Sequence, residues 1–270
     1  MGYLPICYSN QGLRLPEMNW QCSVSVDMFN FEDTAPYKVF WQHEPPEIVD
    51  NIDKLIKNAK FYDLILTWHQ RVLSECGNAK FFPMGSVWTP ESDMSHKKFA
   101  ASFITSSKTM CWGHQYRQDI YNLLPEAVRE LKITKHRSPP WLPNKLGLLE
   151  PFQFHIVMEN AMHNNFFSEK VNDAFATKTF PLYYGCPNLA DFYNPDGFMK
   201  WDSPRDLTDI LKGLRPEFYE SRRAAIEENY ERAQKYVDRT GNLVKAITDS
   251  WTPKIDEWEG GPNVMRGGGL

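Results

Sequence analysis

The sequence predicts an α/β protein with two halves, each built on a parallel sheet, that face each other across a cleft. Two observations lead to this prediction. Short β-branched or aromatic runs alternate with segments of helical spacing, and a polar, turn-rich stretch at residues 88–95 interrupts the alternation before it resumes. Strand–helix–strand alternation is typical of parallel sheets, which bind ligands at the carboxyl ends of their strands.

The first half is predicted from runs before residue 92. Three runs are strand candidates and one segment has apolar residues at helical spacing. These are a short apolar run at 3–8, strands at 37–41, 63–68 and 80–83, and a helix at 48–59.

The second half is predicted over residues 93–214, followed by a helical segment at 215–258 and a flexible Gly-rich tail at 259–270. Ser168 is a good N-cap, and the proline-rich stretch 137–144 must be an irregular loop. We expect strands at 99–105, 152–158 and 180–184, and helices at 116–131, 169–177, 206–214 and 217–246.

The composition excludes several classes of protein. Of 270 residues, 42% are apolar and 24% charged, as in a soluble globular protein, and the net charge of −4 predicts no nucleic-acid partner. No apolar run approaches the roughly 20 residues of a membrane-spanning helix, so we expect a cytoplasmic protein without a transmembrane segment. Peripheral membrane association, or an anchor outside this sequence, stays open. The five widely spaced cysteines, with no C-x-x-C, predict reduced core thiols.

Polar residues connect a predicted strand to a predicted helix at 159–170. Glu159 and Asn160 follow the strand, and Glu169 and Lys170 open the helix. A helix N-terminus offers free N–H groups and partial positive charge, which suit a phosphate. Lys170 opposes the helix dipole, so a functional role for it is one interpretation of the segment. The residues alone leave a second reading open, a capped surface helix with a solvated Glu and Lys.

The same segment resembles a known family. Glu159, Asn160, His163, Glu169 and Lys170 fall, without a gap, in register with the signature of the α-1,3/4-fucosyltransferases, glycosyltransferase family ten, and the residues up to Phe198 resemble its bacterial branch. Two positions depart from the pattern. Phe166 stands where the family usually has Tyr, which removes one hydroxyl contact, and Ser168 replaces Thr but keeps the hydroxyl.

Two weaker matches lie upstream. Arg117, on the predicted helix that follows the strand at 99–105, matches a family Arg assigned to the donor diphosphate, and a guanidinium can donate to two phosphate oxygens. The stretch 40–46 resembles the strand end that carries the family's catalytic base, which makes Glu44 the candidate base and Glu47 the reserve.

The resemblance implies a GT-B arrangement of two Rossmann-like halves with C-terminal helices. It implies an inverting transferase that moves L-fucose from GDP-β-L-fucose to a glycan acceptor, with Glu44 as base. No Asp-x-Asp motif follows a strand, so we expect no metal and no other cofactor. Three alternatives stay open: a different nucleotide sugar, a non-catalytic sugar-binding protein, and a helical partner protein. The residues predicted to bind the donor are Arg117, Asn160, Phe166, Glu169 and Lys170.

Overall fold

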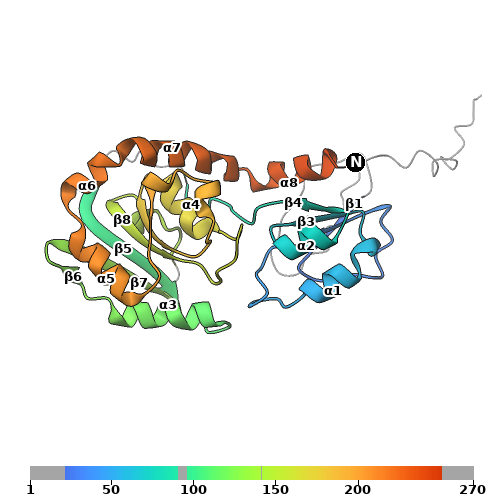
Figure 1. Ribbon diagram of the computed structural model, residues 1–270, viewed down its shortest axis with the longest axis horizontal. Coiled ribbons are helices and arrows are strands. Elements are labelled where there is room, and N and C mark those ends of the chain that lie inside the picture. The colour runs from blue at the N-terminus through green and yellow to red at the C-terminus, as the bar shows by residue number, and fades with distance from the viewer. Residues whose placement is uncertain (1–21, 91–95, 141, 251–270) are drawn as a thin grey trace, which may run out of the picture.

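The computed structural model describes residues 22–90, 96–140 and 142–250. The apolar run at 3–8, the predicted tail at 259–270 and most of the predicted boundary at 88–95 lie outside the described residues. Two lobes make up the described chain, as predicted (Figure 1). The domain boundaries predicted at residues 92 and 214 stay predictions.

The first lobe contains a four-stranded parallel sheet whose strands follow one another in chain order. Helices α1 and α2 connect the strands and pack on one face, where Leu55 and Val72 contact the buried side chains Phe40 and Ile65. The three predicted strands are confirmed, and the structure adds a strand at the edge. The elements are β1 (Cys22–Val26), β2 (Tyr37–Trp41), α1 (Ile52–Lys57), β3 (Leu64–Thr67), α2 (Gln70–Glu75) and β4 (Ala79–Phe81).

The second lobe contains a six-stranded sheet of order β10-β9-β8-β5-β7-β6, parallel except for the pairing of β6 with β7. Its central strand β8 is buried along its whole length, as its continuous apolar sequence predicts. The strands are β5 (Lys98–Ser106), β6 (Ala127–Val128), β7 (Leu131–Ser138), β8 (Phe152–Met158), β9 (Phe180–Tyr184) and β10 (Met199–Lys200).

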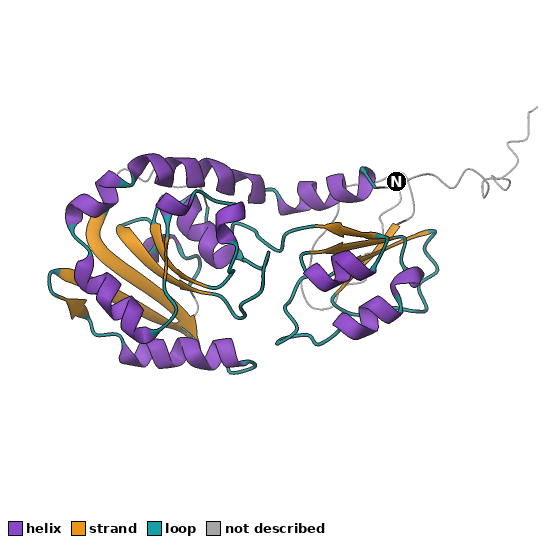
Figure 2. Cartoon of the chain, in the orientation of Figure 1, coloured by secondary structure: helices purple, strands orange, loops and turns teal. Residues whose placement is uncertain are grey.

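Helices cover both faces of the second sheet (Figure 2). One face packs against α3, α5 and α6, and the other against α4, while α7 contributes Ile226 to the first cluster and Ala233 to the second. The helices are α3 (Trp112–Leu123), α4 (Glu169–Ala176), α5 (Pro204–Gly213), α6 (Pro216–Ser221), α7 (Arg223–Ala233) and α8 (Arg239–Thr248). Single 3₁₀ turns are η1 (Ala59–Phe61), η2 (Leu146–Leu148), η3 (Leu189–Asp191), η4 (Pro195–Gly197) and η5 (Gln234–Tyr236).

The prediction that α3 continues to residue 131 is wrong. The helix ends at Leu123, and Leu124 is extended, with φ −67° and ψ 125°. Pro125 explains this end, because a proline disfavours the helical conformation of the residue before it. The following residues form β7, which pairs with β5 in the sheet.

The prediction of a single long helix at 217–246 is also wrong. The structure breaks it into α6, α7 and α8, with a new start at Asp238, whose side chain accepts from the Gly241 N–H (2.8 Å). Helix α8 extends from the second lobe to the first, where Leu243 and Ile247 pack on the face of the sheet opposite α1 and α2 (Figure 1). The last described helix therefore belongs by packing to the first lobe.

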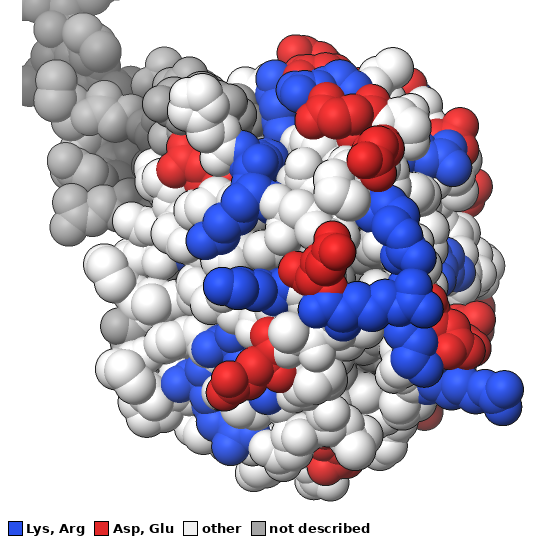
Figure 3. Space-filling view, turned by 90° about the vertical axis from the view of Figure 1, so that its left-hand side faces the viewer, with Lys and Arg blue, Asp and Glu red and all other residues white. Residues whose placement is uncertain are grey.

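The outer end of the second lobe carries both signs of charge, interspersed (Figure 3). On α5, Asp209 lies within 4 Å of both Arg205 and Lys212, and Glu220 pairs with Arg223 at 3.0 Å. Such exposed pairs contribute little stability, but mixed signs do not suit a polyanionic partner on this face. Of the helices in the described part of the chain, none is long and apolar enough to cross a membrane.

Candidate active site

A cavity of about 400 Å³ lies between the two lobes. It opens where β2 of the first lobe and β5 and β8 of the second end, as expected for parallel sheets. The first lobe contributes His43, Glu44, Met84 and Trp88 to its lining. Charged residues from the second lobe include Lys108, Arg117, Lys145, Glu169, Lys170 and Asp173.

Glu44 lies in the loop after β2, and Asp27 holds that loop in place. Asp27 follows β1 with a positive φ of 56°. Its carboxylate accepts from the backbone N–H of His43 (2.7 Å) and from that of Glu44 (3.0 Å). Two backbone bonds to one buried carboxylate fix the direction in which Glu44 leaves the sheet. No sequence pattern indicates a role for Asp27, because its contacts join it to His43 and Glu44, 16 and 17 positions away.

Burial dominates the electrostatics around Glu44. It raises the pKa of Glu44, although the charge of Lys170 opposes the shift. It also lowers the pKa of His43 to about 3, so this imidazole, 3.7 Å from the Glu44 carboxylate, is neutral near pH 7. Burial raises the pKa of Asp27 to about 7 against the effect of its two backbone bonds. A carboxylate with a raised pKa at a cavity wall is suited to accept a proton.

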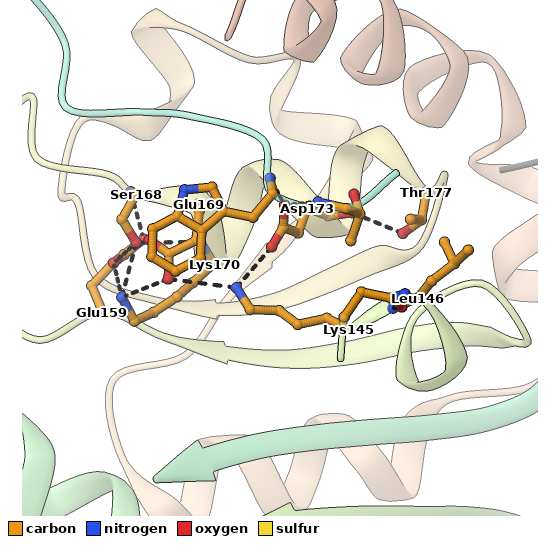
Figure 4. A network of polar contacts seen from close by, with 11 residues as sticks. Lys145, Leu146, Glu159, Ser168, Glu169, Lys170, Asp173 and Thr177 are labelled. Atoms are coloured by element: carbon orange, nitrogen blue, oxygen red, sulfur yellow. Dashed lines mark hydrogen bonds and ion pairs between the residues drawn. The ribbon is translucent and has the colours of Figure 1, made fainter. Parts of the chain in front are cut away.

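The start of α4 has the predicted capped geometry. Ser168 is the N-cap, and its Oγ accepts from the Lys170 N–H. The same hydroxyl donates to Glu159 Oε2 (2.6 Å), and the Ser168 N–H donates to Glu159 Oε1 (2.9 Å). Lys170 Nζ lies 3.1 Å from Ser168 Oγ and 3.7 Å from Glu159 Oε2 (Figure 4). The buried Glu159 therefore fixes the cap and Lys170 together.

Glu169 lies between two lysines. Its Oε1 is 3.4 Å from Lys170 Nζ and 3.5 Å from Lys145 Nζ. Burial alone would raise the pKa of this carboxyl, but Lys170 and Lys145 hold it well below its usual range. Glu169 is thus a buried, ionised acceptor that faces the cavity, as a ligand hydroxyl requires.

Lys145 and Asp173 complete the network and were not predicted as site residues. Lys145 Nζ pairs with Asp173 Oδ2 at 2.7 Å (Figure 4). Asp173 Oδ1 accepts from the backbone N–H groups of Trp88 (2.6 Å) and Thr89 (3.1 Å), on the segment that joins the lobes. Lys145 follows a proline-rich loop without periodicity, so no local pattern indicates its role.

Arg117 and Asn160, which both line the cavity, contact each other. Arg117 Nη2 donates to Asn160 Oδ1, and its Nε is buried without a hydrogen-bond partner among the described residues. Burial lowers the pKa of Arg117, and Glu159 and Glu169 oppose that shift. Helix α3 approaches closely because Gly113 has no Cβ, which would lie 2.0 Å from the Asn160 carbonyl oxygen.

The structure places Glu44, Arg117, Asn160, Glu169 and Lys170 in the lining of one cavity. Their roles stay predictions.

Phe166 and Glu47 lie elsewhere. Phe166 is 1% exposed, packs on the ring of Trp68 at 4.7 Å and is not a lining residue, so its placement does not support the prediction that it binds the donor. Glu47 pairs with His163 Nε2 at 2.9 Å across the two lobes, which makes it a poor reserve for the base.

The described residues offer neither a disulfide nor a cluster of metal ligands. Cys22, Cys76, Cys111 and Cys186 are buried free thiols, as predicted, whereas Cys7 lies outside the described residues. Over residues 22–90, 96–140 and 142–250, no group of three or more His, Cys, Asp or Glu is arranged to hold a metal ion.

Comparison with known proteins shows which family the second lobe resembles. Residues 94–223 match the model of the glycosyltransferase family 10 (fucosyltransferase) C-terminal region. Over this stretch the chain resembles glycosyltransferase family 10. An α-(1,3)-fucosyltransferase of Helicobacter pylori is 24% identical over 215 residues, 80% of this chain and 39% of the relative. The chain thus spans about two fifths of the curated relative, and both matches support the predicted glycosyltransferase.

Solved structures with a similar fold confirm the GT-B arrangement. An α1,3-fucosyltransferase solved with GDP gives a TM-score of 0.54 at 16% identity, covering 87% of this chain and 79% of that one. Anabaena Alr3699/HepE, solved in complex with UDP-glucose, gives 0.54 at 12% identity, covering 79% and 72%. At these identities the likeness shows the fold alone.

Proposed function

We propose that this chain is an inverting glycosyltransferase that moves L-fucose from GDP-β-L-fucose to a hydroxyl of a glycan acceptor. The single observation that carries the proposal is the shared cavity. A carboxylate with a raised pKa, Glu44, comes from the first lobe, and two cations, Arg117 and Lys170, come from the second. The match to family 10 and a neighbour solved with GDP-fucose support this choice of donor.

The proposed reaction is a single displacement. The acceptor oxygen forms a bond to the anomeric carbon while the bond from that carbon to the β-phosphate oxygen of GDP breaks, which inverts the configuration. Glu44 takes the proton of the attacking hydroxyl, and Arg117 and Lys170 stabilise the charge that develops on GDP. Asn160 and Glu169 orient ribose or sugar hydroxyls. These cations supply the charge that a metal provides in other sugar transferases, so we propose that activity persists in a chelator such as EDTA.

The test is release of GDP from GDP-fucose in the presence of fucosylatable glycans. Removal of one charge-stabilising donor typically costs roughly 10²–10³ in rate, so Arg117→Ala and Lys170→Ala should both lose nearly all turnover. Lys178→Ala is the matched control, because Lys178 pairs with Glu227 at 2.5 Å and does not line the cavity. If either cavity variant keeps more than about a tenth of wild-type activity, the phosphate assignment is wrong.

A second candidate is a transferase of the same fold that uses another nucleotide sugar, since the fold is shared with a protein solved with UDP-glucose. A thermal-shift series with GDP-fucose, GDP-mannose and UDP-sugars separates the two, because a ligand stabilises the folded state by mass action. A non-catalytic sugar-binding protein would bind the donor in this series and release no GDP.

We further propose that the protein is cytoplasmic. Peripheral association with a membrane can be tested by flotation with lipid vesicles.

A further inference from the structure

The cavity contains a cation that the proposed reaction does not use. Lys145 Nζ lies 2.7 Å from Asp173 Oδ2 and 3.5 Å from Glu169 Oε1. Its ammonium is 4.9 Å from the centroid of the Trp88 ring, within range of a cation–π contact. Both partner carboxylates are almost completely buried, and the lysine side chain is 24% exposed.

The two lysines of the network share one carboxylate, and each also contacts a second one of its own. Lys170 contacts Glu159 and Glu169, whereas Lys145 contacts Glu169 and Asp173 (Figure 4). Three buried carboxylates therefore face two ammonium groups. Loss of Lys145 would leave Lys170 as the only ammonium of this network, with Arg117 on α3 as the other nearby cation. The three buried carboxylates would then carry added negative charge beside the proposed diphosphate site, which opposes binding.

Asp173 connects the same lysine to the segment between the lobes. The Asp173 carboxylate accepts from the backbone N–H groups of Trp88 and Thr89 with one oxygen and from Lys145 with the other. Trp88 itself lines the cavity. Lys145 thus contacts an acidic wall of the cavity and, through one intermediate side chain, the backbone that links the halves.

We propose that Lys145 is a positioning residue of the donor site, which holds the Glu169 carboxylate toward the donor and fastens the interlobe segment to α4 through Asp173. This inference rests on the proposed function, because it assumes that the cavity takes a nucleoside diphosphate sugar. It assigns a role to a residue in a proline-rich region outside the segments that resemble the family signature.

The test compares Lys145→Met with Lys145→Arg, and uses Lys178→Met as control. Lys178 has the same kinds of partner, a carboxylate at 2.5 Å and the Tyr230 ring at 4.6 Å, but lies away from the cavity. We expect Lys145→Met to weaken GDP binding in a calorimetric titration, and to raise the KM for GDP-fucose, by tenfold or more. The KM for the acceptor should change little, Lys145→Arg should restore most of the loss, and Lys178→Met should match wild type.

The pH dependence of donor binding separates positioning from general stability. With one of its two lysines gone, Glu169 should lose its charge at a higher pH, so the acid limb of GDP affinity should move to higher pH in Lys145→Met. Lys145→Arg should keep the wild-type profile. The charged and titratable groups around Glu169 are Lys170 and Asp173 on α4, Glu159 after β8, Arg117 on α3, and His43 and Glu44 in the first lobe.

Two outcomes would overturn the proposal: GDP affinity unchanged in Lys145→Met, or an affinity loss with an unshifted pH profile. If Lys145→Met does not fold, the double variant Lys145→Met/Asp173→Asn removes the unpaired charge at Asp173 and leaves Glu169 with Lys170 alone. Wild-type donor KM in that double variant would exclude a role at Glu169. GDP titration also separates this proposal from the function. A wild type that binds GDP but releases none from GDP-fucose refutes the transferase and leaves Lys145 testable.

Discussion

The packing of α8 on the first lobe gives a stability prediction with a calculable size. Ile247 is completely buried against the first sheet, in a cluster with Val39 and Trp41. Ile247→Ala removes three carbon atoms, and at about 0.8 kcal/mol for each buried methylene the transfer loss is about 2.4 kcal/mol. The cavity left behind adds to this, so we expect the free energy of unfolding to fall by about 3 kcal/mol.

Urea denaturation followed by circular dichroism measures this loss. With a denaturant slope of about 3 kcal/mol per molar, at the upper end for urea, the midpoint should fall by about 1 M. Val237→Ala is the matched control, because Val237 is 53% exposed between α7 and α8 and its truncation should cost less than about 0.5 kcal/mol. If Ile247→Ala lowers the midpoint no more than Val237→Ala does, α8 does not cover the first sheet as described.

Three further predictions concern the cavity. Gly113→Ala should lower GDP affinity by about tenfold or more in a calorimetric titration, because the new Cβ pushes α3 away from the Asn160 carbonyl. The control is Gly213→Ala, which has open space around its Cβ and should bind GDP like wild type. Ser168→Ala should lower the free energy of unfolding by about 1–2 kcal/mol in thermal melts, since α4 loses its cap, and an unchanged melting temperature would contradict the capping geometry. Burial raises the pKa of Glu44, so kcat should rise with pH as this base ionises, and a flat kcat profile between pH 4 and pH 7 would exclude Glu44 as the base.

The segment 152–184 was predictable because its signals are local. A continuous apolar run gives β8, a serine before an acidic first turn gives the start of α4, and a second apolar run gives β9. The strand ends that follow such runs also place Glu44 and Asn160 at the cavity, since parallel strands present their carboxyl ends at one edge.

The missed features depend on contacts between distant residues. Lys145 meets Glu169 across 24 positions and Asp173 across 28, and Asp27 meets Glu44 across 17. No periodicity within a loop encodes such a contact, because the topology of the sheet brings the loops together. The prediction lacks β7 because it continues a helix past Pro125, although a proline disfavours the helical conformation of the residue before it.

The return of α8 to the first sheet has a consequence for any exchange of parts between related enzymes. Residues 22–90 provide all four strands of that sheet, but residues 239–248 provide the side chains that cover one of its faces. A chimaera that transplants only residues 22–90 would pack this sheet against the α8 of another enzyme. The buried side chain of Trp41 and its neighbours in the cluster would then be mismatched or exposed. The transferable unit therefore consists of two separate stretches of the chain, residues 22–90 and 239–248, and grafting it requires two coordinated replacements.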